Sequence, residues 1–148
     1  MKKSIIAGVL FLMLGWGSAF ARNEEIISER VINSFKKEFT GAQEVSWEGQ
    51  KTFAKATFKL NNQVMFAYYS KEGELMAVIR NMASGQLPIG LLTELKKNYQ
   101  QYWITDLFEK ASNGSSNYFV TLENGDETLV LKADGLAGWQ LFKVTKNN

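Results

Sequence analysis

An internal repeat constrains this chain more than any single motif does. The segment Phe35-Lys36-Lys37-Glu38-Phe39 is matched sixty residues later by Leu95-Lys96-Lys97-Asn98-Tyr99. Self-similarity at a fixed spacing predicts a supersecondary unit that occurs twice. We expect the two repeats to span about 24–84 and 86–146. Two turn signals also recur, at a spacing of 62 residues: Asn62 with Asn124, and Gly73 with Gly135.

Each repeat begins with a helical pattern and continues with strand patterns. Over 25–39, apolar residues recur every fourth position, which is typical of a helix with one buried face. Pro88 suits the first turn of a second helix, over 89–99. The polar segment 111–117 is expected to form a loop. Strands are expected over 45–47, 52–60, 63–69 and 75–80, and again over 103–108, 118–122, 127–132 and 139–145.

These elements predict an α+β fold made of a tandem repeat of two helix-plus-antiparallel-sheet units. A unit of about 60 residues rarely buries enough surface to be stable alone. The two units are therefore expected to share one core or one sheet, so that residues 22–148 form a single compact domain.

Several short motifs in a fixed order resemble a known family. They are Phe35 with Phe39, Gly41-Ala42, Val45-Ser46-Trp47, Ala56-Thr57-Phe58, the turn over 68–74, Leu87-Pro88 and Ala133-Asp134-Gly135. In order and spacing they are similar to the PepSY-like, beta-lactamase-inhibitor-protein-like secreted domains of Gram-negative bacteria. The resemblance covers nearly all of residues 22–148 and implies the same tandem architecture.

Most members of that family have no established function. The inhibitor after which it is named binds an enzyme across the concave face of its sheet, so the resemblance implies protein binding. That inhibitor and several relatives carry disulfides, which this chain lacks because it has no cysteine. No binding residue is transferred by motif.

The first 21 residues have the three parts of a secretory signal. Lys2 and Lys3 precede an apolar run, and Ala19-Phe20-Ala21 has small residues where signal peptidase reads them. A membrane anchor is the alternative, but the apolar run is short for a span of about 20 residues. We expect cleavage after Ala21, no membrane span in the remainder, and a location in the periplasm or outside the cell.

Composition excludes most familiar catalytic chemistry. The chain has no histidine and no cysteine, which excludes Ser–His and cysteine nucleophiles and Cys/His metal sites. Its 17 basic residues less Lys2 and Lys3 equal its 15 acidic residues, a balance that disfavours nucleic-acid binding. A hydrolase that uses carboxylates alone would need paired acids across a cleft. No such pair is indicated among Asp106, Glu109, Glu123, Asp126, Glu127 and Asp134. We therefore expect a non-enzymatic protein without a cofactor or metal.

Alternation sorts the strand residues between two faces. If Asn61-Asn62 forms a hairpin turn, Leu60 faces Gln63 and one face of the strands packs against the helices. The opposite face mixes aromatic, aliphatic and hydroxyl side chains with a lysine, whereas a merely solvated face would be more polar. This face predicts a binding surface, unless neighbouring elements or a second copy of the chain cover it. Its residues are Phe53, Lys55, Thr57, Val64, Phe66, Tyr68, Phe119, Thr121, Thr128 and Val130.

The functional hypothesis is an exported binding protein that inhibits or modulates an envelope or secreted protein. Phe66 and Tyr68 are the expected anchors, because aromatic side chains dominate the energetics of protein interfaces. The alternative is a carrier that holds a lipid, peptide or sugar in a groove between helix and sheet. The sequence is also compatible with association into a homo-oligomer.

Overall fold

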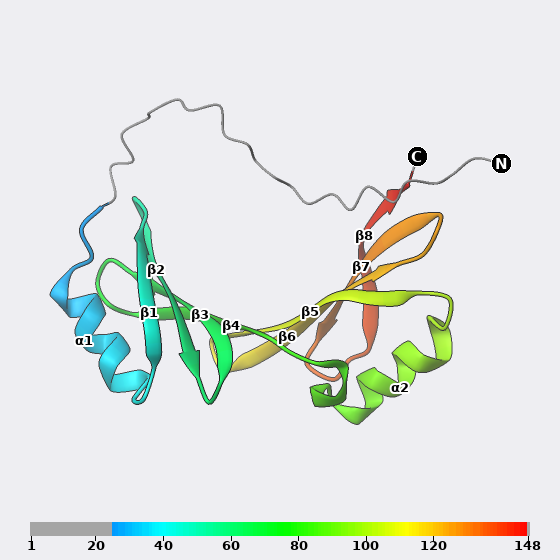
Figure 1. The fold of residues 1–148 in the computed structure, drawn as a ribbon, viewed down its shortest axis with the longest axis horizontal. Helices are drawn as coiled ribbons and strands as arrows, with labels where there is room; N and C mark the ends of the chain where they lie inside the picture. Colours follow the sequence, from blue (N-terminus) through cyan, green and yellow to red (C-terminus); the bar gives the residue numbers. More distant parts are fainter. Residues whose placement is uncertain (1–24, 148) are drawn as a thin grey trace.

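The computed structural model describes residues 25–147, and the predicted signal peptide lies outside them. The described chain forms two similar units (Figure 1). The first unit comprises α1 (Glu29–Glu38), β1 (Gln43–Gly49), β2 (Phe53–Leu60), β3 (Gln63–Ser70) and β4 (Leu75–Asn81). The second unit comprises the 3-10 turn η1 (Ser84–Gln86), α2 (Ile89–Asn98), β5 (Trp103–Ser112), β6 (Ser115–Glu123), β7 (Glu127–Asp134) and β8 (Trp139–Lys146).

The two units share one sheet. All eight described strands pair antiparallel in chain order, from β1 at one edge to β8 at the other. The units meet where β4 pairs with β5, over the four residue pairs from Val78–Ala111 to Asn81–Phe108. Figure 1 shows these two strands between the units, with α1 and α2 toward opposite ends of the molecule. The predicted tandem α+β architecture is therefore confirmed, with a shared sheet.

Each helix covers its own hydrophobic core. Beneath α1, buried side chains of the helix meet those of β2 and β3; this first core consists of Val31, Phe35, Ala54, Ala56, Phe58, Ala67 and Tyr69. The second core, beneath α2, is larger because it also receives residues from β5, from β8 and from the segments that flank η1. It consists of Met82, Leu87, Leu91, Leu95, Leu107, Val120, Leu122, Leu129, Leu131, Ala133 and Trp139.

Local sequence sets the bounds of α1. The hydroxyl of Ser28 accepts a hydrogen bond from the backbone N–H of Val31 at 3.4 Å, which caps the helix. Lys36 and Lys37 in the last turn complement the negative end of the helix dipole. Because the cap lies at Ser28, the helix begins at Glu29, and the expected start at residue 25 was wrong.

Asparagine turns set the register of two hairpins. Asn61 and Asn62 have φ angles of 51° and 63°, and Leu60 pairs with Gln63 as predicted. Asn113 and Gly114, at φ 49° and 74°, join β5 to β6 in the same way. The expected loop over 111–117 was therefore wrong, because β5 and β6 extend directly to this two-residue turn.

Both helices lie on the same face of the sheet. Directly paired residues of adjacent strands point to the same face. Ala67 in the first core pairs with Val78, and Val78 pairs with Ala111, which lies on the same side of β5 as Leu107 of the second core. No helix of the described chain covers the opposite side, which we call the open face.

Tyr69 is a buried phenol in the first core. Its hydroxyl donates a hydrogen bond to Glu38 Oε2 at 2.9 Å, which ties β3 to the end of α1. Burial raises the pKa of Tyr69, and the hydrogen bond to the Glu38 carboxylate raises it further. A raised pKa in the folded state means that folding favours the neutral phenol.

Tyr69→Phe is expected to make the protein less sensitive to alkali. The neutral phenol of Tyr69 stabilises the fold below the ordinary tyrosine pKa of about 10, and that stability is lost as the pH rises further. The variant lacks this loss, although at neutral pH it should be less stable by about 1–2 kcal/mol because a hydrogen bond to a carboxylate is removed. Urea unfolding from about pH 7 to about pH 11 measures both effects. Glu38→Gln keeps the buried phenol and should keep the alkaline loss; equal pH profiles for the two variants would contradict the assignment.

Candidate functional site

The structure places all ten predicted site residues on the open face, in two separate groups. In the first group, Lys55 pairs with Tyr68 and Thr57 with Phe66, across β2 and β3. In the second group, Thr121 pairs with Val130 across β6 and β7. Strands β4 and β5 lie between the two groups. The ten residues therefore share one face but do not form one continuous cluster.

The first group has a packed, partly buried aromatic surface. The rings of Phe53 and Tyr68 lie 5.8 Å apart between centroids, and Lys55 Nζ lies 5.2 Å from the centroid of Phe66. All its side chains are partly buried except Val64, which is 38% exposed. These side chains shield one another, yet no helix or further strand of residues 25–147 covers them.

The second group centres on Phe119. Its ring stacks on Phe108 with centroids 5.0 Å apart, and it meets Phe142 edge-on at 5.8 Å. Phe142 is 65% exposed, so this small aromatic cluster reaches the surface. Sequence reasoning missed Phe108 and Phe142, because faces had been assigned only to the residues of β2, β3, β6 and β7.

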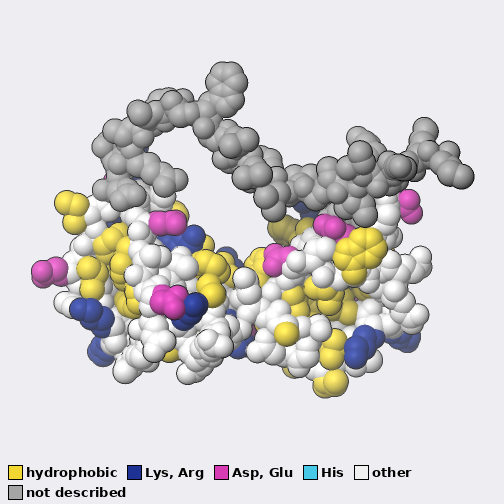
Figure 2. Space-filling view, viewed as in Figure 1, with side chains coloured by type: hydrophobic (Ala, Val, Ile, Leu, Met, Phe, Trp, Pro, Cys, Tyr) yellow, Lys and Arg dark blue, Asp and Glu magenta, His cyan; other side chains and the backbone are white. Residues whose placement is uncertain are grey.

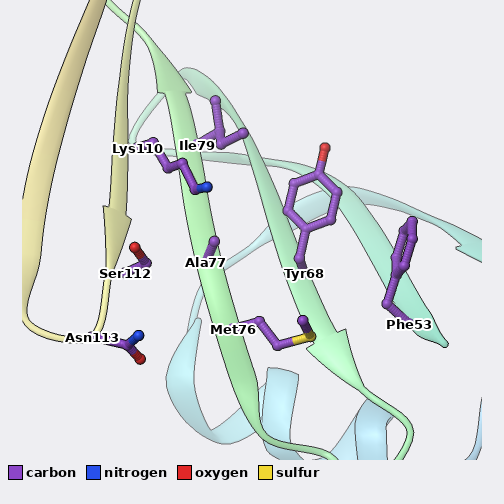
Figure 3. Close-up of a pocket in the computed structure, with 8 residues that line it drawn as sticks. All are labelled: Phe53, Tyr68, Met76, Ala77, Ile79, Lys110, Ser112 and Asn113. Carbon is purple, nitrogen blue, oxygen red and sulfur yellow. The ribbon is translucent and has the colours of Figure 1, made fainter. Parts of the chain in front are cut away.

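A hollow of about 460 Å³ lies between the two groups. Figure 3 shows its lining side chains, which come from β2, β3, β4, β5 and the β5–β6 turn. Of the residues that line the hollow, the sequence predicts only Phe53 and Tyr68 as binding residues. The full lining is Phe53, Tyr68, Met76, Ala77, Ile79, Lys110, Ser112 and Asn113.

Most lysines on the open face have a carboxylate partner. The distance from the lysine Nζ to the nearest carboxylate oxygen is 3.5 Å for Lys55 and Glu48 and 2.8 Å for Lys59 and Glu44. It is 2.7 Å for Lys132 and Asp134. Lys110, in the hollow, forms no ion pair with any residue in 25–147. In the view of Figure 2, side chains of both charge signs are scattered over the surface. Lys143, on the same face of β8, also forms no ion pair within residues 25–147, but it is exposed, whereas Lys110 is partly buried and lines the hollow.

The acidic residues do not converge on a cleft. Glu127 and Asp134 lie at opposite ends of β7, and Glu109 binds Arg80 at 2.5 Å on the helix-covered side. Within residues 25–147, no group of three or more Asp and Glu side chains is placed to hold a metal ion. Glu109, Glu127 and Asp134 therefore do not form the paired acids that hydrolysis by carboxylates requires.

The helix side of the described residues has grooves beside the ends of its helices. A groove of about 330 Å³ lies beside the end of α1 near Phe39 and Trp47. A groove of about 340 Å³ lies at the corresponding place in the second unit, near Tyr99 and Tyr102. Between each helix and the sheet, the two cores fill the space. Neither α1 nor α2, the α-helices that the structure describes, has the length and apolar character that a membrane crossing requires.

Comparison with known proteins identifies the fold. No protein-family model and no curated protein sequence matches the chain. A BLIP-like (beta-lactamase-inhibitor-protein-like) protein from Bacteroides fragilis is similar in structure at 16% identity, with a TM-score of 0.70 over 82% of this chain and 87% of that one. A DUF2874 family protein from Bacteroides ovatus has a TM-score of 0.71 at 13% identity, over 82% and 89%.

A third structure, a candidate periplasmic protein from Bacteroides eggerthii, has a TM-score of 0.70 at 9% identity, over 82% of this chain and 90% of that one. All three matches extend over most of both chains. The arrangement of two helix-plus-four-strand units on one antiparallel sheet is therefore the BLIP-like fold.

Proposed function

We propose that this chain is an exported, non-enzymatic binding protein that holds another protein on its open face. The observation that carries the proposal is the pair of aromatic groups on that face, with a hollow between them and no covering element within residues 25–147. An apolar surface rimmed by polar side chains is typical of a protein interface. Lys55, Lys59 and Lys132, each beside a carboxylate, add charged side chains among the apolar ones of this face.

Export and inhibition have separate support. The N-terminal pattern of Lys2, Lys3, an apolar run and Ala19-Phe20-Ala21 supports a cleaved signal, after which residues 22–148 would act as one domain. The similar structure of a candidate periplasmic protein agrees with an envelope location. The name of the BLIP-like neighbour supports inhibition or modulation of an envelope or secreted protein by analogy of fold. The alternative of a small-ligand carrier has less support, because cores fill the spaces beneath both helices.

Phe66→Asp combined with Tyr68→Asp is expected to abolish partner binding. Two charges on the first aromatic group would remove its anchors and place carboxylates where the partner excludes water. The experiment is affinity capture from envelope and secreted fractions of the native host, with a bait that begins at Arg22 and mass spectrometry as the readout. A stoichiometric protein that the parent retains should be lost with the double variant.

The matched control carries two aspartates away from the open face. Ile26 and Ile89 are strongly exposed beside α1 and in the first turn of α2, so Ile26→Asp with Ile89→Asp adds the same charge to the helix side. This control should capture the same partner as the parent. If the open-face variant folds normally and still captures every partner of the parent, the proposed face is wrong.

A further inference from the structure

Lys110 has no acidic residue among its immediate neighbours on the open face. Lys110 pairs with Ile79 on β4 and with Asn117 on β6, and its nearest neighbours on the same side of β5 are Phe108 and Ser112. None of these four residues is acidic. The side chain is partly buried and belongs to no ion pair within residues 25–147.

Lys110 combines partial burial with the lack of an ion pair, whereas Lys143 on β8 is unpaired within residues 25–147 but exposed. Between β2 and β7, the other lysines of the open face each lie within reach of a carboxylate: Lys55, Lys59 and Lys132. A partly desolvated cation without a counter-charge interacts strongly with any anion that reaches it, because less water screens the attraction. The ammonium of Lys110 therefore favours the binding of a negatively charged group in the hollow.

The other residues that line the hollow indicate the chemistry of a ligand that carries this negative group. Figure 3 shows the Lys110 side chain extending toward the ring of Tyr68, with Ser112 and Asn113 further along the same strand and its turn. The hydroxyl of Ser112 and the amide of Asn113 can donate hydrogen bonds to a carboxylate. Phe53, Met76 and Ile79 are apolar walls. The lining thus combines one cation, two polar groups and an apolar surface.

We propose that the hollow receives an acidic side chain of the partner protein together with an adjacent apolar side chain. This inference rests on the proposed function and names the chemistry of the partner at its centre. A volume of about 460 Å³ can accept such a pair of side chains. A free fatty acid suits it less, because the hollow is formed by one side of one sheet and would leave an alkyl chain in water.

Two blocked peptides test this preference directly. The probes are acetyl-Gly-Phe-Asp-Phe-Gly-amide and its Asn counterpart, titrated at low ionic strength into the isotopically labelled chain that begins at Arg22. Backbone amide shifts are followed by NMR. The Asp peptide should shift the amides of Tyr68, Met76, Lys110 and Ser112 and bind about tenfold more tightly than the Asn peptide, because only the former gains a charge-assisted hydrogen bond. Equal affinities, or no binding by the Asp peptide, would overturn the inference.

Two lysine variants locate the preference. Lys110→Met keeps the length and apolar stem of the side chain but should remove the difference between the Asp and Asn peptides. Lys132→Met, on the same face but beside Asp134, is the matched control and should preserve that difference. A preference that survives in Lys110→Met would place the anion elsewhere. Octanoate is a third probe, and if it competes more strongly than the Asp peptide the occupant is a small amphiphile and the inference is wrong.

The failure of this inference can be distinguished from the failure of the proposed function. In one outcome, the Phe66→Asp/Tyr68→Asp double variant loses the captured partner, while Lys110→Met binds it with full affinity. This result would support the proposed function and overturn the inference that an acidic side chain enters the hollow. A partner that both variants lose, and whose binding weakens with salt, would support both proposals.

Discussion

Phe58→Ala is expected to lower the free energy of unfolding by about 3–5 kcal/mol, the range for truncation of a buried phenylalanine. The Phe58 ring is 1% exposed, and its centroid lies 4.9 Å from that of Phe35 and 4.8 Å from that of Phe39. Truncation would remove contacts to both rings and leave a cavity between α1 and the sheet. The surrounding residues cannot close that cavity without moving the helix.

Urea unfolding followed by far-UV circular dichroism measures this loss. The matched control is Phe53→Ala, because Phe53 lies on the same strand but on the open face, where it is only partly buried. Its cost should stay below about 2 kcal/mol, since solvent fills the vacated space. If the two variants lose equal stability, the assignment of the two faces of β2 is wrong.

Trp139→Ala is expected to destabilise the second unit by a similar amount, about 3–5 kcal/mol. The indole is 8% exposed, and its Nε1–H donates a hydrogen bond to the carbonyl oxygen of Leu91 at 2.9 Å. The side chain thus joins the first residue of the edge strand β8 to the first turn of α2. Its removal costs both the buried aromatic surface and a buried hydrogen bond.

Two further substitutions separate these contributions. Trp139→Phe keeps most of the apolar contact and loses the indole hydrogen bond, so it should cost less than Trp139→Ala. Trp103→Ala is the control, because that indole is 56% exposed on β5, and its cost should stay below about 1 kcal/mol. The same urea titrations give all three values. A Trp103→Ala variant that is as unstable as Trp139→Ala would contradict the core described for the second unit.

Local turn chemistry made much of the first unit predictable. Asn61 and Asn62 fix the β2–β3 register, which decides which residues of the two strands share a side. The apolar alternation then indicates which side faces the helix. The repeat then extended the same alternation to β6 and β7. Because these signals lie within a few residues of the structure they specify, the two groups of predicted site residues were placed on the correct sides of their strands.

The hollow could not be predicted in the same way. It forms because β4 pairs with β5, and these strands are separated in the sequence by η1 and α2. The isolation of Lys110 depends on Ile79 and Asn117, which only that non-local pairing and the β5–β6 hairpin bring alongside it. The dipeptide Asn113-Gly114 did carry a hairpin signal. The polar residues around it favoured a long loop instead. For this reason the strand predicted over 103–108 did not include the second part of β5.

The pairing of β4 with β5 also reduces the number of strand edges that the protein exposes. A four-stranded unit alone would present two strands with unpaired backbone groups, which can template association with other chains. Joining the units satisfies one such strand from each and leaves β1 and β8. The charged residues of β1 are Glu44 and Glu48, and those of β8 are Lys143 and Lys146. Duplication thus leaves two edge strands instead of four, and the charged side chains on both disfavour pairing with a further strand.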